Sequence, residues 1–509
     1  MMLADLLTKS DGKRRAIGAP GRPYMLYGQL RELCHGRAAD LFRHGIGAND
    51  RVAIVLPNGP EMATSFIASA IGAIAAPLNP AYKEAEFEFY LSDLNPKAVI
   101  VDADLDSPVR EVARRLRFPI IDLVVEAGSP AGQFDLYFGD MPKVDSAAAV
   151  SASDTALVLH TSGTTSRPKL VPLSQSNLCA SATHVARTLS LTEEDHCLNV
   201  MPLFHIHGLV AAVLASLNAG ACVTCTPVFN AMKFFAWMSA VTPNWYTAVP
   251  TIHQAILDRA KRNKGVVDGI ELRFIRSSSS SLPPQVMLRL EQTFSCPVIE
   301  SYGMTEAAHQ MTSNSLPPGS RKAGSVGVEA GPEVRLMDSG GRFISQGEGE
   351  IVIRGPNVTN GYEANPHANS SAFVIDPDGG GDWFRTGDQG VFDDEGFLSI
   401  SGRLKEIINR GGEKIAPREV DEVLMDHDDV DQVATFAVSH PKLGEEVAAA
   451  VVLRAGAKVT ERDLRDFVGS RLAAFKIPRM IVFLDDIPKG ATGKLQRIGL
   501  AEKLGLGKC

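Results

Sequence analysis

Short apolar runs alternate along the chain with longer stretches in which apolar residues recur at helical intervals. Arg51–Leu56 is rich in β-branched residues and ends at a Pro-Asn-Gly turn signal, which is typical of a strand. Glu61–Ala75 follows with the apolar spacing of one helix face. Lys97–Val101 and Pro119–Val125 are again short and apolar, as buried strands are. This alternation predicts an α/β fold with largely parallel sheets.

The C-terminal part of the chain has a different pattern and predicts a small α+β unit. Val433–Val438 and Val447–Leu453 have the composition of strands. Thr460 is a suitable helix cap with Asp463 at the third helical position, and Leu464–Leu472 places apolar residues on one helix face. A chain of 509 residues is too long for a single hydrophobic core, so two or more domains are expected.

The overall composition is that of a soluble globular protein, with 45% apolar and 22% charged residues. The net charge of −8 disfavours a nucleic-acid-binding protein with a basic surface, so no nucleic-acid partner is expected. The N-terminus lacks the pattern of a secretory signal. The longest apolar stretch, Ala63–Leu78, is short and interrupted for a membrane span, so we expect no stable membrane insertion.

Cysteine usage indicates a reducing compartment. The seven cysteines are an odd number and show no disulfide framework. Cys222 and Cys225 form a Cys-x-x-Cys inside an apolar run, without a second pair at zinc-site spacing, which favours a buried strand. The C-terminal tripeptide is not a peroxisomal address, and we predict a cytoplasmic protein. The oligomeric state is left open.

The first candidate for chemistry is Leu157–Lys169, which reads LVLHTSGTTSRPK. An apolar strand opens there into a run of Ser, Thr and Gly residues, whose hydroxyls and backbone N–H groups suit close approach to phosphates. Lys169 can follow the negative charge as a point cation. The spacing is not that of a Walker A loop, and an ordinary polar surface loop is the alternative. The candidate phosphate-binding residues are Thr161, Ser162, Gly163, Thr164, Thr165 and Lys169.

TSGTTSRPK resembles the signature of the adenylate-forming enzymes, which include acyl-CoA synthetases, peptide-synthetase adenylation domains and beetle luciferases. Ser166 departs from the pattern, because most members carry Gly there. Further family motifs follow in order, so the resemblance covers nearly the whole chain. It implies a large N-terminal domain of layered α/β subdomains with parallel sheets, residues 1–404, and a small mobile α+β domain, residues 405–509.

The resemblance also assigns nucleotide-binding roles. In SYGMTE, Tyr302 packs on adenine, Thr305 contacts phosphate and Glu306 holds magnesium, which suits the preference of a hard cation for carboxylate oxygen. In WFRTGD, Asp388 ends a tight Thr-Gly turn and accepts the ribose hydroxyls, and Arg403 touches the ribose. Thr165 is the second expected metal ligand. The remaining expected nucleotide contacts are Ser279, Ser280 and Ser281 of the serine run, with Ser301 and Gly303. A solvated serine linker is the alternative for that run.

Three C-terminal features match the family's moving parts. Lys405 stands at the hinge between the domains, and Gly411, Gly412 and Glu413 lie in the loop that lines the CoA channel. Lys494, in a Gly-rich basic loop, matches the catalytic lysine, although an exposed Lys is normally only solubilising.

The resemblance therefore implies an ATP-dependent acid–CoA ligase that works through an acyl-adenylate, with Mg²⁺ as cofactor and ATP and CoA as cosubstrates. A carrier-protein adenylation domain keeps the same motifs, but no carrier domain follows Lys494. A luciferase-like oxygenase shares the fold, and a non-catalytic nucleotide-binding module would not need Lys494 or Glu306.

The candidate acid pocket is polar and basic. His205 of FHIHGL falls on the family histidine that walls the carboxylate pocket and is also a candidate catalytic residue. A buried cation without an anion is costly, so a second substrate carboxylate would explain the set. The segments most resemble the oxalate–CoA ligase branch; malonate, 4-coumarate and medium- or long-chain fatty acids are the alternatives. The alternative is a structural role for these residues, in which Arg276 pairs with a protein carboxylate and the histidines only fill space. The candidate substrate residues are His205, His207, Arg276, Ser277 and His309.

Overall fold

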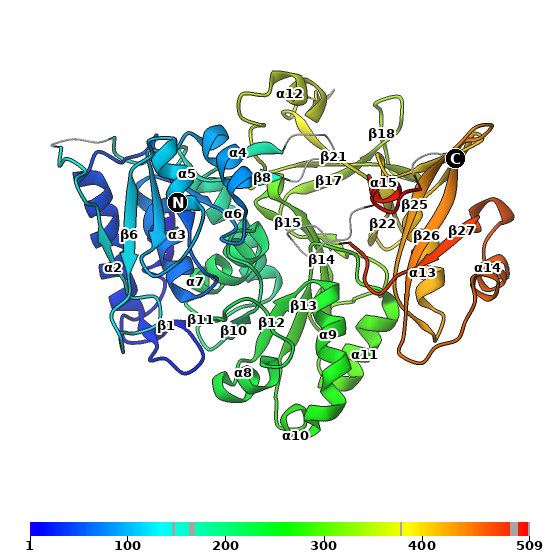
Figure 1. Ribbon diagram of the computed structural model, residues 1–509, viewed down its shortest axis with the longest axis horizontal. Coiled ribbons are helices and arrows are strands. Elements are labelled where there is room, and N and C mark those ends of the chain that lie inside the picture. Colours follow the sequence, from blue (N-terminus) through cyan, green and yellow to red (C-terminus); the bar gives the residue numbers. More distant parts are fainter. Residues whose placement is uncertain (145–147, 162–167, 377–378, 489–496, 507–509) are drawn as a thin grey trace.

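The computed structural model describes residues 1–144, 148–161, 168–376, 379–488 and 497–506. Their strands form four sheets with helices packed around them (Figure 1). The predicted α/β fold with parallel sheets is confirmed. Within these ranges no helix is both long and apolar enough to cross a bilayer.

A seven-stranded sheet with the order β7-β6-β5-β3-β4-β8-β9 forms the first layer. Its inner strands are parallel and its two edge strands antiparallel. The strands are β3 (Arg51–Val55), β4 (Ile74–Pro77), β5 (Ala98–Asp102), β6 (Ile120–Val124), β7 (Asp135–Tyr137), β8 (Thr155–Thr161) and β9 (Lys169–Ser174). The helices of this part are α1 (Leu3–Leu6), α2 (Tyr27–Arg43), α3 (Pro60–Gly72), α4 (Glu84–Leu94) and α5 (Val109–Arg115).

The predicted helix Glu61–Ala75 is too long at its end. Helix α3 stops at Gly72, Ala73 is extended, and Ile74–Pro77 is strand β4 beside β3. Glycine is a poor helix residue, and an Ala-rich apolar run suits a buried helix and a buried strand equally. The apolar pattern therefore hid the boundary.

A nine-stranded sheet with the order β16-β15-β14-β13-β12-β10-β11-β1-β2 forms the second layer. Its strands are β1 (Arg15–Gly18), β2 (Met25–Leu26), β10 (His196–Asn199), β11 (Cys222–Cys225), β12 (Trp245–Ala248), β13 (Phe274–Ser277), β14 (Val298–Met304), β15 (His309–Ser313) and β16 (Val328–Glu329). Its helices are α6 (Gln175–Thr188), η1 (His207–Leu214), α7 (Ala215–Asn218), α8 (Phe234–Val241), α9 (Pro250–Ala260), η2 (Lys261–Asn263), α10 (Lys264–Val267), α11 (Pro284–Phe294) and η3 (Thr305–Ala307). The buried strand predicted at Cys222–Cys225 is confirmed. Strands β10 to β14 are parallel, so their carboxyl ends meet at one edge, where ligands bind in such sheets.

A six-stranded antiparallel sheet forms the third layer. It contains β17 (Glu333–Met337), β18 (Phe343–Ile344), β19 (Glu348–Arg354), β20 (Phe373–Val374), β21 (Trp383–Phe392) and β22 (Leu398–Arg403), beside helix α12 (Pro366–Ala372). The tight turn predicted before Asp388 is wrong, because Trp383–Asp388 lies inside β21. Gly387, at φ +74°, supplies a local irregularity where the register against β19 shifts.

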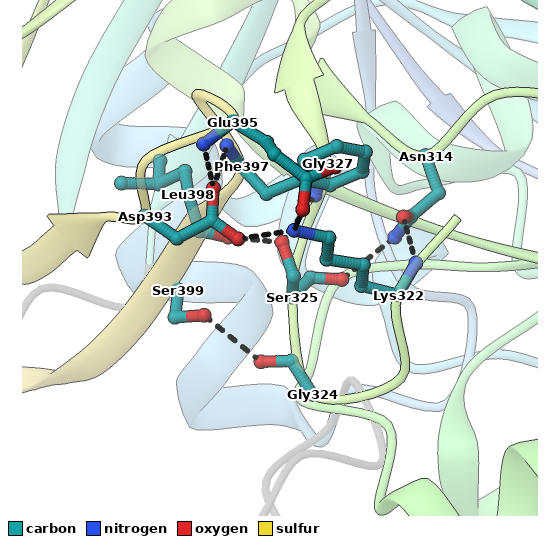
Figure 2. A network of polar contacts seen from close by, with 10 residues as sticks. All are labelled: Asn314, Lys322, Gly324, Ser325, Gly327, Asp393, Glu395, Phe397, Leu398 and Ser399. Carbon is teal, nitrogen blue, oxygen red and sulfur yellow. Dashed lines mark hydrogen bonds and ion pairs between the residues drawn. The ribbon is translucent and has the colours of Figure 1, made fainter. Parts of the chain in front are cut away.

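Polar contacts tie the loop between β15 and β16 to the third sheet (Figure 2). Lys322 Nζ lies 2.5 Å from an oxygen of Asp393 and 2.8 Å from one of Glu395. The Ser325 hydroxyl donates to the carbonyl of Leu398 at 2.7 Å. These contacts hold β22, which ends at Arg403, against the second sheet.

The fourth sheet, at the right in Figure 1, is built from C-terminal strands. It contains β23 (Ile408–Arg410), β24 (Glu413–Ile415), β25 (Val430–His440), β26 (Gly444–Leu453) and β27 (Met480–Phe483), with α13 (Pro417–Met425), α14 (Glu461–Gly469), η4 (Ala474–Lys476) and α15 (Leu500–Lys503). The predicted cap is confirmed, since the Thr460 hydroxyl accepts from the N–H of Asp463. Helix α14 ends at Gly469, so Leu472 lies outside it.

Candidate active site

The serine run lies at the carboxyl edge of the nine-stranded sheet. Ser278 donates its hydroxyl proton to the carbonyl of Ser301 at 2.8 Å. The buried Glu300 carboxylate accepts from the N–H of Leu282 at 2.9 Å. Ser279 has φ +71°, a left-handed conformation that a non-glycine residue adopts only where its surroundings hold it. The run and β14 therefore bring Ser279, Ser280, Ser281, Ser301, Tyr302 and Gly303 to one place.

Two side chains donate hydrogen bonds to the Asp388 carboxylate. The Tyr302 hydroxyl donates to Asp388 Oδ2 at 2.5 Å, and Arg403 Nε donates to Asp388 Oδ1 at 2.7 Å. The carboxylate in turn raises the pKa of Arg403. The predicted ribose-binding residues Asp388 and Arg403 thus lie beside Tyr302, the residue predicted to pack on adenine. The Tyr302 hydroxyl is hydrogen-bonded to Asp388.

Glu306 and Lys169 meet at a third residue, Tyr362. Glu306 is 6% exposed, and burial raises the pKa of its carboxyl, whereas the hydrogen bond from Tyr362 lowers it. The Tyr362 hydroxyl lies 2.9 Å from Glu306 Oε1, and Lys169 Nζ lies 4.1 Å from the centre of the Tyr362 ring. Thr305 is half-buried beside Glu306, and Thr161 contacts the carbonyl of Lys169 at 3.5 Å. An acid and a cation suited to a metal-bound phosphate chain are therefore adjacent.

Arg276 is completely buried at the end of β13. Its Nη2 lies 3.2 Å from His309 Nε2 and 3.2 Å from Gln310 Oε1. Among the described residues, its Nε and Nη1 have no hydrogen-bond partner, and the same holds for the Ser277 hydroxyl. Burial lowers the pKa of Arg276 to about 9, so it still carries its charge at neutral pH. In the described part of the chain no carboxylate forms an ion pair with it.

His207 links His309 to the serine run. Its Nδ1 lies 3.0 Å from the Ser279 hydroxyl and its Nε2 lies 2.6 Å from the Thr247 hydroxyl. Its ring stacks on that of His309, with centroids 4.9 Å apart. His205 is half-buried two residues earlier in the chain, with its ring 4.5 Å from that of Phe204. The structure thus brings together four of the five predicted substrate residues, His207, His309, Arg276 and Ser277, next to the serine run.

The turn that carries His309 is strained. Ala308 has φ +47° and His309 has φ +110°, a region that only glycine adopts readily. The strain accompanies a close approach, since a Cβ on Gly303 would lie 1.8 Å from the carbonyl oxygen of His309. Glycine is therefore required at position 303, and the tight fit holds His309 against Arg276.

The predicted hinge and CoA residues lie at the start of the fourth sheet. Lys405 is exposed, two residues after the end of β22. Gly411 and Gly412, with φ +61° and +99°, form the turn of the β23–β24 hairpin, and Glu413 begins β24. Hinge motion and CoA contact stay predictions. Ser162, Gly163, Thr164, Thr165 and Lys494 lie outside the described residues.

The AMP-binding enzyme family matches residues 9–363, and the AMP-binding enzyme C-terminal domain matches residues 419–494. The chain belongs to the AMP-binding enzyme family. It is 44% identical to "Probable CoA ligase CCL9" of Humulus lupulus, over 98% of this chain and 96% of that protein. It is also 44% identical to "Oxalate--CoA ligase" of Arabidopsis thaliana, over 97% of this chain and 96% of that protein. Its fold is similar to "ATP bound MatB from Rhodopseudomonas palustris", with a TM-score of 0.87 and 29% identity over 99% of both chains.

The donor set of this AMP-binding enzyme fits magnesium shared with a nucleotide. In the described part of the chain, no group of three or more His, Cys, Asp or Glu could hold a metal by itself. Glu306 offers a single hard oxygen donor next to the cation Lys169. Mg²⁺ favours this arrangement, with one or two carboxylates and the remaining ligands from phosphates and water.

Sequence reasoning missed three residues of this AMP-binding enzyme's site. Tyr362 contacts Glu306 and Lys169, Gln310 contacts Arg276, and Thr247 contacts His207. Tyr362 follows an Asn-Gly turn signal, which marks a loop and not a site. Gln310 stands next to His309 in the same candidate segment, AAHQMTSN, and was not singled out there.

Glu300→Gln is expected to stabilise the enzyme above neutral pH. Burial raises the pKa of Glu300 to about 7, and Arg418 and Glu422 of α13 are the charged groups that face it. Since the unfolded carboxyl titrates near about 4.3, the wild-type fold loses stability as pH rises from there through about 7. The amide cannot ionise, so the variant should lack this loss and gain roughly 3–4 kcal/mol at pH 8.

Urea denaturation at pH 5 and pH 8 measures this difference. Glu271→Gln, at an exposed carboxylate, is the control for losing one charge. If the stability of Glu300→Gln falls between these pH values as steeply as that of the wild type, Glu300 does not carry the effect.

Proposed function

We propose that this AMP-forming acid–CoA ligase activates oxalate. The observation that carries the proposal is the guanidinium of Arg276, which is fully buried, charged at neutral pH, and without a partner for Nε and Nη1 among the described residues. A buried cation without an anion costs several kcal/mol, whereas a substrate carboxylate would supply charge and acceptors together. Similarity to an oxalate–CoA ligase over nearly the full length supports the same substrate.

One oxalate carboxylate would point toward Arg276, His309 and Ser277, and the other would remain for reaction. Two polar side chains, Gln310 and His309, contact the guanidinium of Arg276. A long acyl chain would place methylene groups against this buried charge and gain little from burial. A short dicarboxylate matches the chemistry better.

In the first half reaction a carboxylate oxygen of the acid attacks the α-phosphorus of ATP, and the bond to pyrophosphate breaks. The nucleophile needs no deprotonation, so the protein contributes position and charge. Asp388 and Arg403 would hold the ribose, Lys169 and Thr161 would hold the β- and γ-phosphates, and Glu306 would hold Mg²⁺, which neutralises phosphate charge when bound. The predicted α-phosphate cation is Lys494.

In the second half reaction the CoA thiol attacks the acyl carbon, loses its proton, and displaces AMP. We expect the C-terminal domain, residues 405–509, to turn about Lys405 and bring the hairpin of Gly411, Gly412 and Glu413 to the acyl-adenylate. The glycines can take the positive φ values that a changing loop passes through.

A panel of acids tests the proposal. Pyrophosphate release and CoA-thioester formation are measured with oxalate, malonate, acetate, 4-coumarate and octanoate. We expect oxalate to have the highest kcat/KM, because only a short dicarboxylate satisfies Arg276 while its other carboxylate reaches ATP. A higher kcat/KM for malonate than for oxalate would mean that the substrate is a dicarboxylate, but a longer one. Faster turnover of octanoate or 4-coumarate would overturn the proposal.

A further inference from the structure

The segment Val358–Glu363 bridges the two halves of the phosphate site. The N–H of Thr359 donates to the carbonyl of Glu306 at 2.8 Å, and its hydroxyl donates to the carbonyl of Pro172 at 2.8 Å. The N–H of Glu363 donates to the carbonyl of Leu170 at 3.0 Å. The segment is therefore bonded both to the turn that carries Glu306 and to β9, which begins at Lys169.

Tyr362 uses both of its chemical parts in this bridge. Its hydroxyl donates to Glu306 Oε1 at 2.9 Å, and its ring lies under the ammonium of Lys169, 4.1 Å from Nζ to the ring centre. The side chain is 8% exposed and its backbone is fixed by Asn369, whose amide bonds its N–H and its carbonyl at 2.7 and 2.8 Å. One rigid residue therefore orients an acid and a cation that come from separate sheets.

We propose that Tyr362 is a positioning residue that holds the Glu306 carboxylate and the Lys169 ammonium in register for a metal-bound triphosphate. The proposal rests on the proposed use of ATP and magnesium, and it does not depend on which acid is activated. The hydroxyl binds one oxygen of the Glu306 carboxylate, and this bond would fix the orientation in which the carboxylate could hold a metal ion. The ring limits where Lys169 can stand, because a cation is attracted to the face of an aromatic ring.

A purely structural role is the competing explanation. The Tyr362 ring also packs edge-on against the buried ring of Phe384, with centroids 6.2 Å apart. If packing were its whole purpose, loss of the hydroxyl would leave metal dependence unchanged. The two roles therefore predict different results for a variant that keeps the ring.

The test compares Tyr362→Phe with Tyr362→Leu. ATP binding is measured by calorimetry with Mg²⁺ and with EDTA, without acid or CoA, and the melting temperature is recorded. Since a hydrogen bond to a charged group is lost, we expect Tyr362→Phe to reduce the tightening of ATP binding by Mg²⁺ about tenfold. Its ATP affinity in EDTA should stay unchanged, because the ring beneath Lys169 remains. Tyr362→Leu should weaken ATP binding in EDTA as well.

Phe384→Leu is the matched control, since it removes a ring that packs on Tyr362 and keeps both the ring and the hydroxyl of Tyr362. It should lower the melting temperature and leave the Mg²⁺ effect intact. In the wild type, pyrophosphate release should also reach half its maximum at a roughly tenfold lower Mg²⁺ concentration than in Tyr362→Phe. Equal Mg²⁺ effects in Tyr362→Phe and the wild type would overturn the proposal. A failure of oxalate in the acid panel would leave these binding results unaffected, so the two proposals fail separately.

Discussion

Lys494→Ala is expected to lower the rate of adenylation by at least about a hundredfold, comparable to the loss of an aligned donor to a transition-state charge. Attack by a carboxylate on the α-phosphorus brings two anions together, and Lys494 is the predicted cation between them. Pyrophosphate release from acid and ATP without CoA measures this step. Thioester formation from preformed acyl-AMP should survive, because the attack on the α-phosphorus, which needs the cation, is then already complete.

The difference between the half reactions separates this role from misfolding. Lys494 itself lies outside the described residues, but the chain on both sides of it is anchored. Ile487 is fully buried, and Arg497 pairs with Glu406 and Asp421. Lys489→Ala, in the same Gly-rich loop, controls for the loss of one positive charge. Normal adenylation by Lys494→Ala, or equal loss of both half reactions, would remove Lys494 from its assigned role.

The nucleotide-binding roles were predicted from short runs of consecutive residues and stay predictions, although the structure brings Tyr302, Asp388 and Arg403 into contact. SYGMTE places Tyr302 and Glu306 on one strand and its following turn, and no distant contact is needed to recognise them. Tyr362 is different, because it reaches Glu306 across 56 residues of sequence from an unremarkable loop. A single aromatic residue carries no periodic signal, so only the folded chain reveals its role.

The helix that carries His207 was also beyond the sequence pattern. His207–Leu214 forms a π-helix, a form that often marks functional sites. Every residue of this short segment is buried, so there is no polar face from which to read a period.

The surroundings of Arg276 likewise depend on strand register. β15 pairs Met304 with His309 and Gly303 with Gln310, and this register sets the two polar groups against the guanidinium.

Arg276→Met is expected to raise the KM for oxalate at least about thirtyfold, because truncating one partner of a buried charge pair costs about 2–5 kcal/mol. Methionine has a similar length and no charge, so the cavity that it leaves is small. ATP affinity should change little, since the guanidinium contacts His309 and Gln310 rather than the nucleotide residues. Steady-state kinetics with oxalate and acetate check the result, and kcat/KM for acetate should fall much less than that for oxalate.

The melting temperature of Arg276→Met distinguishes a substrate role from a structural one. If the arginine served the fold through a protein carboxylate, its removal would strand a buried anion and destabilise the enzyme by about 3–5 kcal/mol. Because no described carboxylate pairs with it and two of its nitrogens have no partner in the described residues, losing the charge should instead leave stability unchanged or raise it. Arg276→Lys keeps the charge without the planar fork and should recover only part of the oxalate affinity. A large fall in melting temperature with an unchanged KM for oxalate would assign Arg276 to the fold and remove the main physical argument for a dicarboxylate.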